Sequence, residues 1–337
     1  MINVGVIGYG YWGPNLVRNF VEAPGCQVIA VSDLRPERLA FVKARYPGIK
    51  TTSDHRDLFI DSMIDAIAIA TPVSTHFDLA MQALQAGKHV LVEKPMTANS
   101  EQAIRLVEEA ERLNRVLMVD HTFVYTSAVR KIRELVEGNE LGEIYYYDSV
   151  RVNLGLFQHD VNVIWDLAVH DLSIMDYVLR VFPVAISATG MNHILGQPEN
   201  VAYVTLFFEG NMIAHLHINW LSPVKVRRTL IGGSQKMIVY DDLDPSERIK
   251  VYDKGVTFNQ TSESVYKMLV SYRTGDMWAP QLDFKEALQV EAVHFINCIE
   301  KGRRPITDGE AGLKVVRILE AASQSMLERG RPVKLDR

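Results

Sequence analysis

A glycine-rich turn near the start of the chain constrains the fold more than any other feature of the sequence. Residues 8–13 read Gly-Tyr-Gly-Tyr-Trp-Gly, directly after an apolar run at 2–7 and before a helical pattern that ends near residue 22. The next apolar run, at 27–32, is closed by Asp33. A GxGxxG turn between a strand and a helix, with an acid at the end of the second strand, indicates a βαβ unit that binds a dinucleotide.

Each position of this turn has a separate physical role. Gly8 permits the tight turn, Gly10 lets the backbone approach a pyrophosphate, and Gly13 lets the helix pack closely on the strand. The helix N-terminus offers unpaired N–H groups and a partial positive charge to phosphates. A glycine turn with a capping aspartate and no cofactor is the alternative interpretation. The flanking strand and helix favour the first, which places Tyr11 and Trp12 beside the cofactor.

The acid after the second strand bears on which dinucleotide binds. Asp33 can accept hydrogen bonds from both hydroxyls of a ribose and would repel a 2′-phosphate, which favours NAD over NADP. Leu34 follows at the same edge and is expected to contact the cofactor. Arg35 and Arg38 weaken the preference, because arginines accommodate a 2′-phosphate. NAD is therefore the predicted cofactor.

Short apolar runs alternate with amphipathic stretches over the first third of the chain. Strands are expected at 2–7, 27–32, 65–70, 88–92 and 115–119, and helices at about 12–22, from Pro36, at 74–86 and at 100–113. Runs that are apolar throughout are typical of strands buried on both faces, as in a parallel sheet. We therefore predict an α/β fold in which residues 1–121 form a doubly wound parallel sheet of the Rossmann type.

The pattern changes after about residue 121. Helices are expected at about 126–137, 161–180, 283–300 and 308–329, and a strand rich in Tyr and Val at 143–153. Five more β-rich runs follow closely at 183–191, 201–208, 211–220, 224–232 and 235–240, which favours a mixed, mostly antiparallel sheet. Residues 122–337 are predicted to form a C-terminal α/β domain with a large open sheet. Residues 241–282 have the weakest pattern, consistent with a mobile loop.

Composition excludes several classes of protein. Apolar residues make up 47% of the 337 and charged residues 23%, as in ordinary globular proteins. The net charge of −5 and the scattered basic residues give no reason to expect a nucleic-acid partner. No apolar run approaches the ~20 residues of a membrane span, and no signal-peptide pattern is apparent. Cys26 and Cys298 have no metal-binding spacing, so we expect reduced thiols, no metal site and a cytoplasmic location.

Polar residues follow three predicted strands at the edge where doubly wound sheets bind ligands. They are Glu93 and Lys94 after 88–92, Thr71 and Pro72 after 65–70 with His76 in the next helical turn, and His121 after 115–119. Burial and a positive nicotinamide ring would lower the pKa of Lys94, which suits a proton acceptor. A surface lysine before a turn proline, and a helix-start role for residues 71–75, are the alternatives.

A second group of candidates lies in the C-terminal half. Asp166 and His170 are four residues apart, so on a helix they share one face. His170 titrates near neutrality and can exchange a hydroxyl proton, while Asp166 can orient the substrate or the imidazole. Arg151, Asn153 and Arg227 are candidates for binding substrate hydroxyls or a phosphate. The alternatives are a capping or core histidine and ordinary packing on the sheet surface.

These motifs together resemble those of the glucose–fructose oxidoreductase/inositol 2-dehydrogenase/MocA family. The matching elements are GYGYWG at 8–13, ATP at 70–72 with His76, EKP at 93–95 and Asp-x-x-x-His at 166–170, of which EKP is the most specific. The resemblance spans nearly the whole chain. It implies an NAD-binding Rossmann domain, a C-terminal sheet that forms a homodimer or homotetramer, and a catalytic trio of Lys94, Asp166 and His170. Ala168 departs from a position that is often glycine in the family, which would alter how closely substrate approaches.

The resemblance also implies a reaction at one hydroxyl-bearing carbon of a sugar or cyclitol. The segments GYGYWGPNL, NLGLFQHDVNVIWDLAVHD and WLSPVK are most similar to members that act on nucleotide-linked amino sugars. Oxidation of the 3-hydroxyl of UDP-N-acetylglucosamine, for lipid A or surface-polysaccharide synthesis, is therefore the expected activity. A free cyclitol or hexose dehydrogenase is the alternative within the enzymes. A non-catalytic NAD(H)-binding regulator is the alternative outside them, and it would not need Lys94, Asp166 and His170 together.

Overall fold

The computed structural model describes residues 1–155, 161–258 and 270–335. The chain divides into two compact units, each defined by the contacts among its own residues. The first comprises Met1–Thr126 and Lys285–Glu320, and the second comprises Ser127–Phe284 and Ala321–Arg337. The sequence places all of 122–337 in one domain, whereas the structure groups residues 285–320 with the N-terminal unit. Each unit is described separately below.

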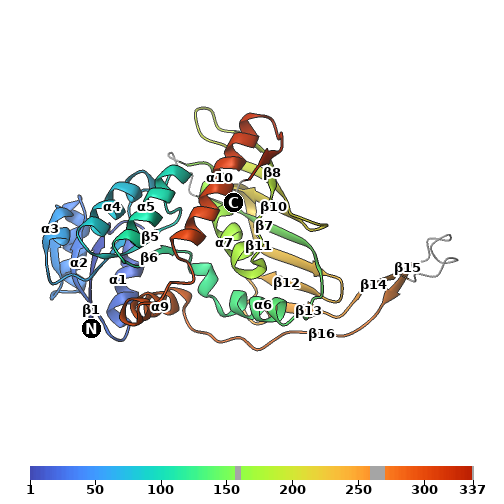
Figure 1. Ribbon diagram of the computed structural model, residues 1–337, viewed down its shortest axis with the longest axis horizontal. Coiled ribbons are helices and arrows are strands. Elements are labelled where there is room, and N and C mark those ends of the chain that lie inside the picture. Colours follow the sequence, from blue (N-terminus) through green and yellow to red (C-terminus); the bar gives the residue numbers. More distant parts are fainter. Residues whose placement is uncertain (156–160, 259–269, 336–337) are drawn as a thin grey trace. The chain divides into compact units, whose positions relative to one another are not determined.

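The first unit is built on a six-stranded parallel sheet (Figure 1). Its strands are β1 (Ile2–Ile7), β2 (Cys26–Ser32), β3 (Lys50–Thr52), β4 (Ala66–Ile69), β5 (His89–Glu93) and β6 (Leu117–Asp120), in the order β3-β2-β1-β4-β5-β6. The order reverses between β1 and β4, so their carboxyl ends open a crevice where a ligand binds. The doubly wound sheet predicted from the sequence is confirmed, and β3 is a short edge strand that the pattern did not predict.

Helices cover this sheet and connect its strands. They are α1 (Gly13–Glu22), α2 (Pro36–Arg45), α3 (Arg56–Ile60), η1 (Val73–Thr75), α4 (His76–Gln85), α5 (Ser100–Arg112) and η2 (Thr122–Tyr125). Pro36 opens α2, and the side chain of Asn99 caps α5 by accepting a hydrogen bond from the Gln102 N–H. The central strands are mostly apolar, with β4 buried throughout and β1 buried from Val4 onward, as is typical of parallel strands between two helical layers.

The late segment joins the first unit because its helix has an apolar face that fits α1. Phe295 of α9 (Ala287–Lys301) lies edge-on to Phe20, with ring centroids 6.2 Å apart. Arg18 and Glu286 form an ion pair of 2.6 Å at the start of the same helix. Near the end of β6, the Val119 N–H donates to the Thr307 carbonyl oxygen, and the Thr307 hydroxyl donates to the Val119 carbonyl oxygen. These contacts close the first unit around its sheet.

The second unit contains a nine-stranded sheet and a smaller two-stranded one (Figure 1). The strands are β7 (Ile144–Leu154), β8 (Ala185–Met191), β9 (Val201–Phe207), β10 (Ile213–Asn219), β11 (Leu221–Gly233), β12 (Met237–Asp241), β13 (Ile249–Tyr252), β16 (Met277–Trp278) and β17 (Val333–Lys334). Only β7 and β10 pair in parallel, so the predicted mixed, mostly antiparallel sheet is confirmed. In part of the weakly patterned region, β14 (Gly255–Phe258) pairs with β15 (Val270–Arg273).

One face of the large sheet is covered by helices of its own unit. The helices of this unit are α6 (Ser127–Glu137), the π-helical turn η3 (Ile164–Ala168) and α7 (Val169–Leu179), while α10 (Gly309–Leu327) crosses from the first unit into the second. Along β9 and β10, buried residues alternate with more exposed ones, because only one face is covered. The uncovered face carries Tyr203, His215 and His217, with stacked rings.

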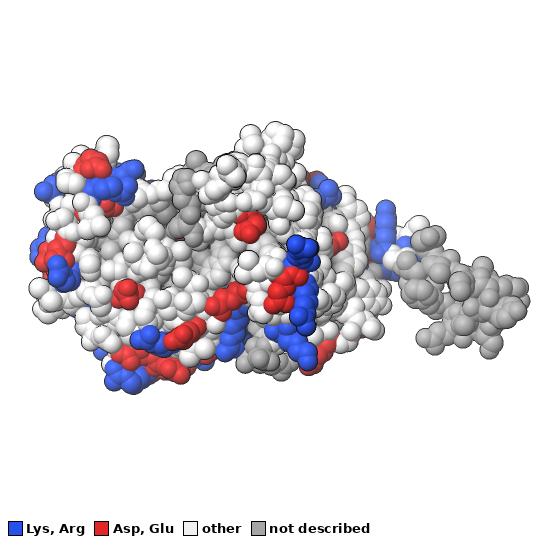
Figure 2. All heavy atoms as spheres, turned by 90° about the horizontal axis from the view of Figure 1, so that it is seen from above, with Lys and Arg blue, Asp and Glu red and all other residues white. Residues whose placement is uncertain are grey.

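Charge and helix hydropathy describe the surface of the described residues. On the face drawn in Figure 2, acidic and basic side chains of the described residues are interspersed. None of the helices in the described parts of the chain is long and apolar enough to cross a membrane. Those same parts contain no group of His, Cys, Asp and Glu side chains that could hold a metal ion.

Candidate active site

A cavity of about 780 Å³ opens at the carboxyl edge of the parallel sheet in the first unit. Ten of the predicted cofactor residues line it: Gly8, Gly10, Tyr11, Trp12, Asp33, Leu34, Thr71, Pro72, Glu93 and Lys94. They come from the turns after β1, β2, β4 and β5, which the sheet order brings to one edge. The volume lies within the range of small-molecule sites. The residues that the sequence assigned to one cofactor site therefore do surround one cavity.

The glycine-rich turn has the geometry that a pyrophosphate needs. Gly8 has φ of +95°, and a Cβ there would lie 2.4 Å from the carbonyl oxygen of Ala70. A Cβ on Gly13 would lie 2.2 Å from the Gly8 carbonyl oxygen, so α1 can approach the turn only with glycine. At Gly10 a Cβ would meet only Nη2 of Arg35, at 3.4 Å. The backbone at Gly10 is thus open to the cavity, and no side chain caps the start of α1.

Asp33 lies at one end of this cavity and is almost fully buried. Its Oδ2 accepts a hydrogen bond of 2.7 Å from the Tyr9 N–H, and Arg35 donates to both of its oxygens through Nε and Nη2. Burial alone would raise the pKa of Asp33, but the hydrogen bonds from Arg35 and Tyr9 outweigh it and hold the pKa below its usual value. Asp33 therefore stays a carboxylate that can accept hydrogen bonds from a ribose. These features fit a bound NAD.

Carboxyl groups gather at the other end, beside Lys94. Trp12 Nε1 donates a hydrogen bond of 3.0 Å to Asp120 Oδ2, and Thr122 donates one of 2.5 Å to Oδ1. Burial raises the pKa of Glu93 well above its usual value, and Asp120 raises it further. The same two causes raise the pKa of Glu291, a fully buried residue of α9. Lys94 thus follows directly on an acid whose pKa is held well above its usual value.

Three predicted cofactor residues do not line the cavity. Gly13 lies behind the turn, where it packs against Gly8. His76 is buried, and its two ring nitrogens each lie 2.8 Å from a backbone carbonyl oxygen, that of Pro95 and that of Thr71. His76 therefore ties together the loops after β4 and β5. His121 is only 2% exposed, and burial lowers its pKa to about 4, so it is neutral.

Asp166 and His170 lie in the second unit, on a helix that begins with a π-helical turn. The Asp166 N–H donates a hydrogen bond to the carbonyl oxygen of Asn162, and Trp220 Nε1 donates one of 3.1 Å to Asp166 Oδ2. The turn η3 runs directly into α7, which carries His170 in its first turn. Single π-helical turns inside helices are frequent at functional sites, because they change which way a side chain points.

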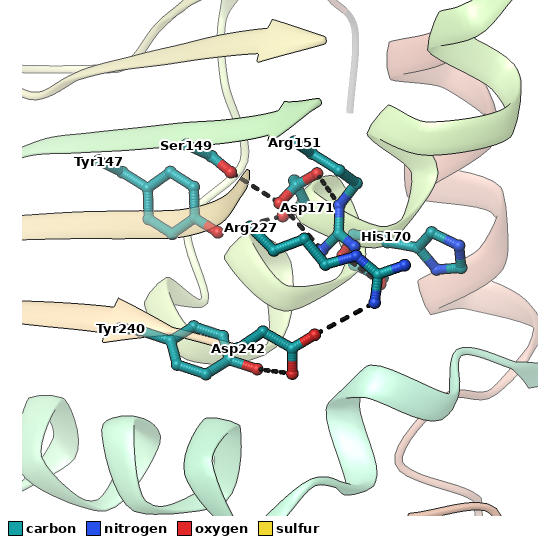
Figure 3. Close-up of polar contacts among 9 residues, drawn as sticks. Tyr147, Ser149, Arg151, His170, Asp171, Arg227, Tyr240 and Asp242 are labelled. Atoms are coloured by element: carbon teal, nitrogen blue, oxygen red, sulfur yellow. Dashed lines mark hydrogen bonds and ion pairs between the residues drawn. The ribbon is translucent and has the colours of Figure 1, made fainter. Parts of the chain in front are cut away.

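Arg151, a predicted substrate residue, forms a buried ion pair with the neighbour of His170. Its Nε lies 2.6 Å from Asp171 Oδ2, and both side chains are at most 4% exposed (Figure 3). Ser149 donates a further hydrogen bond of 2.7 Å to the same carboxylate. A guanidinium held in this way joins β7 to α7 and so fixes the helix that carries His170. Its contact with substrate remains a prediction.

The other predicted substrate residues lie on the same sheet. Arg227 Nη1 lies 3.2 Å from Asp242 Oδ2, and Tyr240 donates to the other oxygen of that carboxylate (Figure 3). Asn153 is half-buried near the end of β7. Both stay predictions as substrate contacts. The stretch NLGLFQHDVNVIWDLAVHD, which carried part of the family resemblance, falls partly at 156–160, outside the described residues.

Sequence reasoning missed four residues that the structure places at these sites. Asp120 precedes His121 and had a signal, since it also ends a strand at the ligand edge. Trp220 begins the segment WLSPVK, but nothing in the sequence indicates its bond to Asp166. Arg35 was weighed for its charge and not for its bond to Asp33. Glu291 had no local signal, because it lies on a helix far along the chain whose pattern reads as ordinary packing.

Comparisons with known proteins agree with this geometry. The model of an oxidoreductase family with an NAD-binding Rossmann fold matches residues 2–121, and the model of the GFO/IDH/MocA C-terminal domain matches residues 129–239. The chain is 33% identical to the uncharacterized oxidoreductase YdgJ of Escherichia coli K12, over 73% of each chain.

Two characterised proteins are similar over more of their length. The chain is 25% identical to the NAD⁺-dependent scyllo-inositol 2-dehydrogenase of Bacillus subtilis, covering 100% of this chain and 95% of that one. The solved structure of UDP-N-acetylglucosamine 3-dehydrogenase from Acidithiobacillus ferrooxidans superposes with a TM-score of 0.79 at 27% identity, covering 97% of each chain.

Proposed function

The chain belongs to the GFO/IDH/MocA oxidoreductase family, and from this we propose that it oxidises the 3-hydroxyl of UDP-N-acetylglucosamine, or of a related nucleotide amino sugar, to a ketone. It is an NAD-dependent oxidoreductase that acts on sugar hydroxyls. The observation that carries the proposal is the cavity in which the glycine turn, Asp33 and Lys94 lie together. Bound NAD⁺ supplies the hydride acceptor of the reaction.

The roles of the protein groups follow from their chemistry. Asp33 holds a ribose, and the open backbone at Gly10 with the start of α1 holds the phosphates. Lys94 lies at the opposite end of the cavity, where the reacting part of the cofactor belongs. The hydroxyl proton passes to Lys94 or to His170, and Asp166 orients the substrate or the imidazole. The protein thus contributes orientation and proton transfer.

The choice of a nucleotide amino sugar has two supports. The structure superposes on UDP-N-acetylglucosamine 3-dehydrogenase over almost all of both chains. In sequence, the two proteins are 28% identical over 94% of each. We further propose an enzyme that serves lipid A or surface-polysaccharide synthesis in the cytoplasm. It would work as a homodimer or homotetramer, joined through the open face that carries Tyr203 and His215.

A free cyclitol is the second candidate substrate. The scyllo-inositol dehydrogenase matches the whole chain, so overall similarity alone does not decide between the two classes. The residues that hold NAD would serve either substrate equally well. The difference lies in whether the second unit holds a nucleotide as well as a sugar ring.

Isotope transfer tests the substrate and the position together. Purified protein is mixed with NAD⁺ and UDP-N-acetylglucosamine that carries deuterium at C3, at mildly alkaline pH. We expect NADH absorbance to grow and the NADH to carry the deuterium. Myo-inositol and glucose run beside it. Turnover of a free sugar alone would move the enzyme to the second candidate, and undeuterated NADH would reject oxidation at C3.

A further inference from the structure

Three carboxyl groups from distant parts of the chain meet at the Lys94 end of the cavity. Glu93 ends β5, Asp120 ends β6, and Glu291 lies in α9. Asp120 is 2% exposed and Glu291 is fully buried, while Glu93 lines the cavity. Glu93 and Asp120 are paired residues of the neighbouring strands β5 and β6, and the charge of Asp120 acts on both glutamates. The cluster therefore extends from the cavity wall into the core of the first unit.

The protonation of this cluster is constrained by elementary chemistry. A carboxylate only accepts hydrogen bonds, so two carboxyl groups can bond only when one holds a proton. Asp120 accepts hydrogen bonds from Trp12 Nε1 and from the Thr122 hydroxyl, so both of its oxygens already have a donor. Both carboxyl oxygens of Glu291 are buried without a hydrogen-bond partner among the described residues. Burial and the nearby Asp120 raise the pKa of both glutamates, so these two members hold a proton more readily than exposed glutamates do.

The other titratable groups near the three carboxyl groups add only one positive charge. Lys94 follows Glu93 directly after the end of β5. His121 follows Asp120, and the charges of both Asp120 and Lys94 act on its imidazole. His121 is neutral, and its two ring nitrogens have no hydrogen-bond partner within the described structure. Tyr125 faces Glu291 from η2 and is also neutral, because burial raises its pKa well above the usual value. Lys94 is the one nearby cation among these groups.

The location of the cluster indicates a role in binding the cofactor. The adenosine ribose belongs at Asp33, so the nicotinamide belongs at the Glu93 and Lys94 end. The nicotinamide ring is positive in NAD⁺ and neutral in NADH, and a nearby positive charge favours the ionised form of a carboxyl group. We propose that Glu93, Asp120 and Glu291 form a proton-sharing cluster that releases a proton when NAD⁺ binds and retains it when NADH binds.

This cluster makes the two forms of the cofactor respond differently to pH. Because binding of NAD⁺ is linked to release of a proton, its affinity rises with pH by at most about tenfold per pH unit. The affinity for NADH changes little over the same range. The inference depends on the NAD site and not on the choice of sugar. An enzyme that oxidises the sugar but binds both cofactors with equal proton release would overturn it and leave the proposed function intact.

Titration calorimetry in two buffers with different ionisation enthalpies counts the protons. We expect wild-type protein to release more protons with NAD⁺ than with NADH, and Glu93→Gln to release equal numbers. Glu286→Gln is the matched control, because Glu286 lies on the surface just before α9 and bonds to Arg18. It should behave as wild type. Equal counts for the two cofactors in wild type, or a difference that survives in Glu93→Gln, would overturn the proposal.

A second measurement needs no variant and applies even if Glu93→Gln fails to fold. The infrared difference spectrum of wild-type protein reports protonated carboxyl groups directly. We expect NAD⁺ binding to remove part of a protonated-carboxyl band and NADH binding to leave that band in place. An unchanged band with both cofactors would contradict the proposal.

Discussion

The indole Nε1 of Trp220 donates a hydrogen bond of 3.1 Å to Oδ2 of Asp166. Trp220 is fully buried between β10 and β11, and a Cβ on Gly155 would lie 2.5 Å from its Cδ1. The backbone N–H of Trp220 also donates to the Asn200 carbonyl. The sheet therefore fixes the indole, and the indole fixes the carboxylate on the π-helical turn. We infer that Trp220 positions Asp166.

Replacing Trp220 by Phe keeps an aromatic ring and removes the N–H. A hydrogen bond to a charged group contributes about 1.5–3 kcal/mol, so we expect kcat to fall about tenfold or more. The KM for the sugar should change less, and the pH profile of kcat should shift if Asp166 influences His170. Steady-state kinetics across pH, with thermal unfolding beside it, provide the check.

Trp165→Phe is the matched control for this variant. Trp165 directly precedes Asp166, but its Nε1 donates a hydrogen bond of 2.9 Å to the Ser323 hydroxyl. The same Trp→Phe change there leaves the Trp220–Asp166 hydrogen bond in place. We expect its kcat and pH profile to match wild type. Equal losses in both variants would mean that the effect is structural and that Trp220 has no positioning role.

Alanine substitutions at two glycines of the turn are expected to have different effects, one on NAD affinity and one on stability. Gly10→Ala places a Cβ where only Arg35 is near, so the protein should fold with an unchanged melting temperature but bind NAD at least about tenfold more weakly. Gly13→Ala drives a Cβ into the Gly8 carbonyl and should lower the melting temperature. Gly48→Ala, with nothing within 4 Å of the new Cβ, is the control. Normal NAD affinity in Gly10→Ala would reject the assigned pyrophosphate path.

Cofactor choice is expected to depend on Asp33. Asp33→Ser replaces a carboxylate, which can accept from both ribose hydroxyls, by a single neutral hydroxyl, and it releases Arg35 from its ion pair. NAD affinity should fall, and the ratio of NADP to NAD affinity should rise by about tenfold or more, because a freed guanidinium pairs well with a phosphate. Fluorescence titration with NADH and NADPH measures both constants. An unchanged ratio would show that Asp33 does not select the cofactor.

Glu291→Gln is expected to stabilise the protein at neutral pH. The pKa of Glu291 in the folded state lies well above 4.5, so the unfolded chain loses its proton first as pH rises, and stability falls from about pH 4.5 upward. Glutamine does not titrate, and His121 is common to both proteins. The variant should therefore melt higher than wild type at neutral pH, with the gap closing toward pH 4.5. A constant gap across pH would contradict the protonated state of Glu291.

The first unit was predictable because its signals are local. The glycine turn, the buried strands and Asp33 lie within the first 33 residues, and the parallel order then sends each strand end to one edge. Lys94 ends up in the cavity for that reason alone. The second sheet was also predicted in outline, since its strands are close in sequence and pair with their neighbours.

The rest depends on contacts between distant residues. Glu291 is brought to Asp120 by the packing of α9 on α1, and no periodicity shows which helix it will pack against. Trp220 contacts Asp166 because the end of β10 lies beside the π-helical turn. That turn has no sequence signature. His76 looked like a cofactor residue because it follows a strand end, but its two carbonyl contacts turn it into a link between loops.

The most direct test of the account is NADH formation from UDP-N-acetylglucosamine by wild-type protein and by Lys94→Ala, after NAD⁺ binding has been shown in both. We expect clear turnover in wild type and a loss of about 10²-fold or more in the variant, with NAD⁺ still bound. Turnover that survives in Lys94→Ala would contradict the role of Lys94. Absence of turnover in wild type with nucleotide sugars and free sugars alike would contradict the proposed oxidation itself.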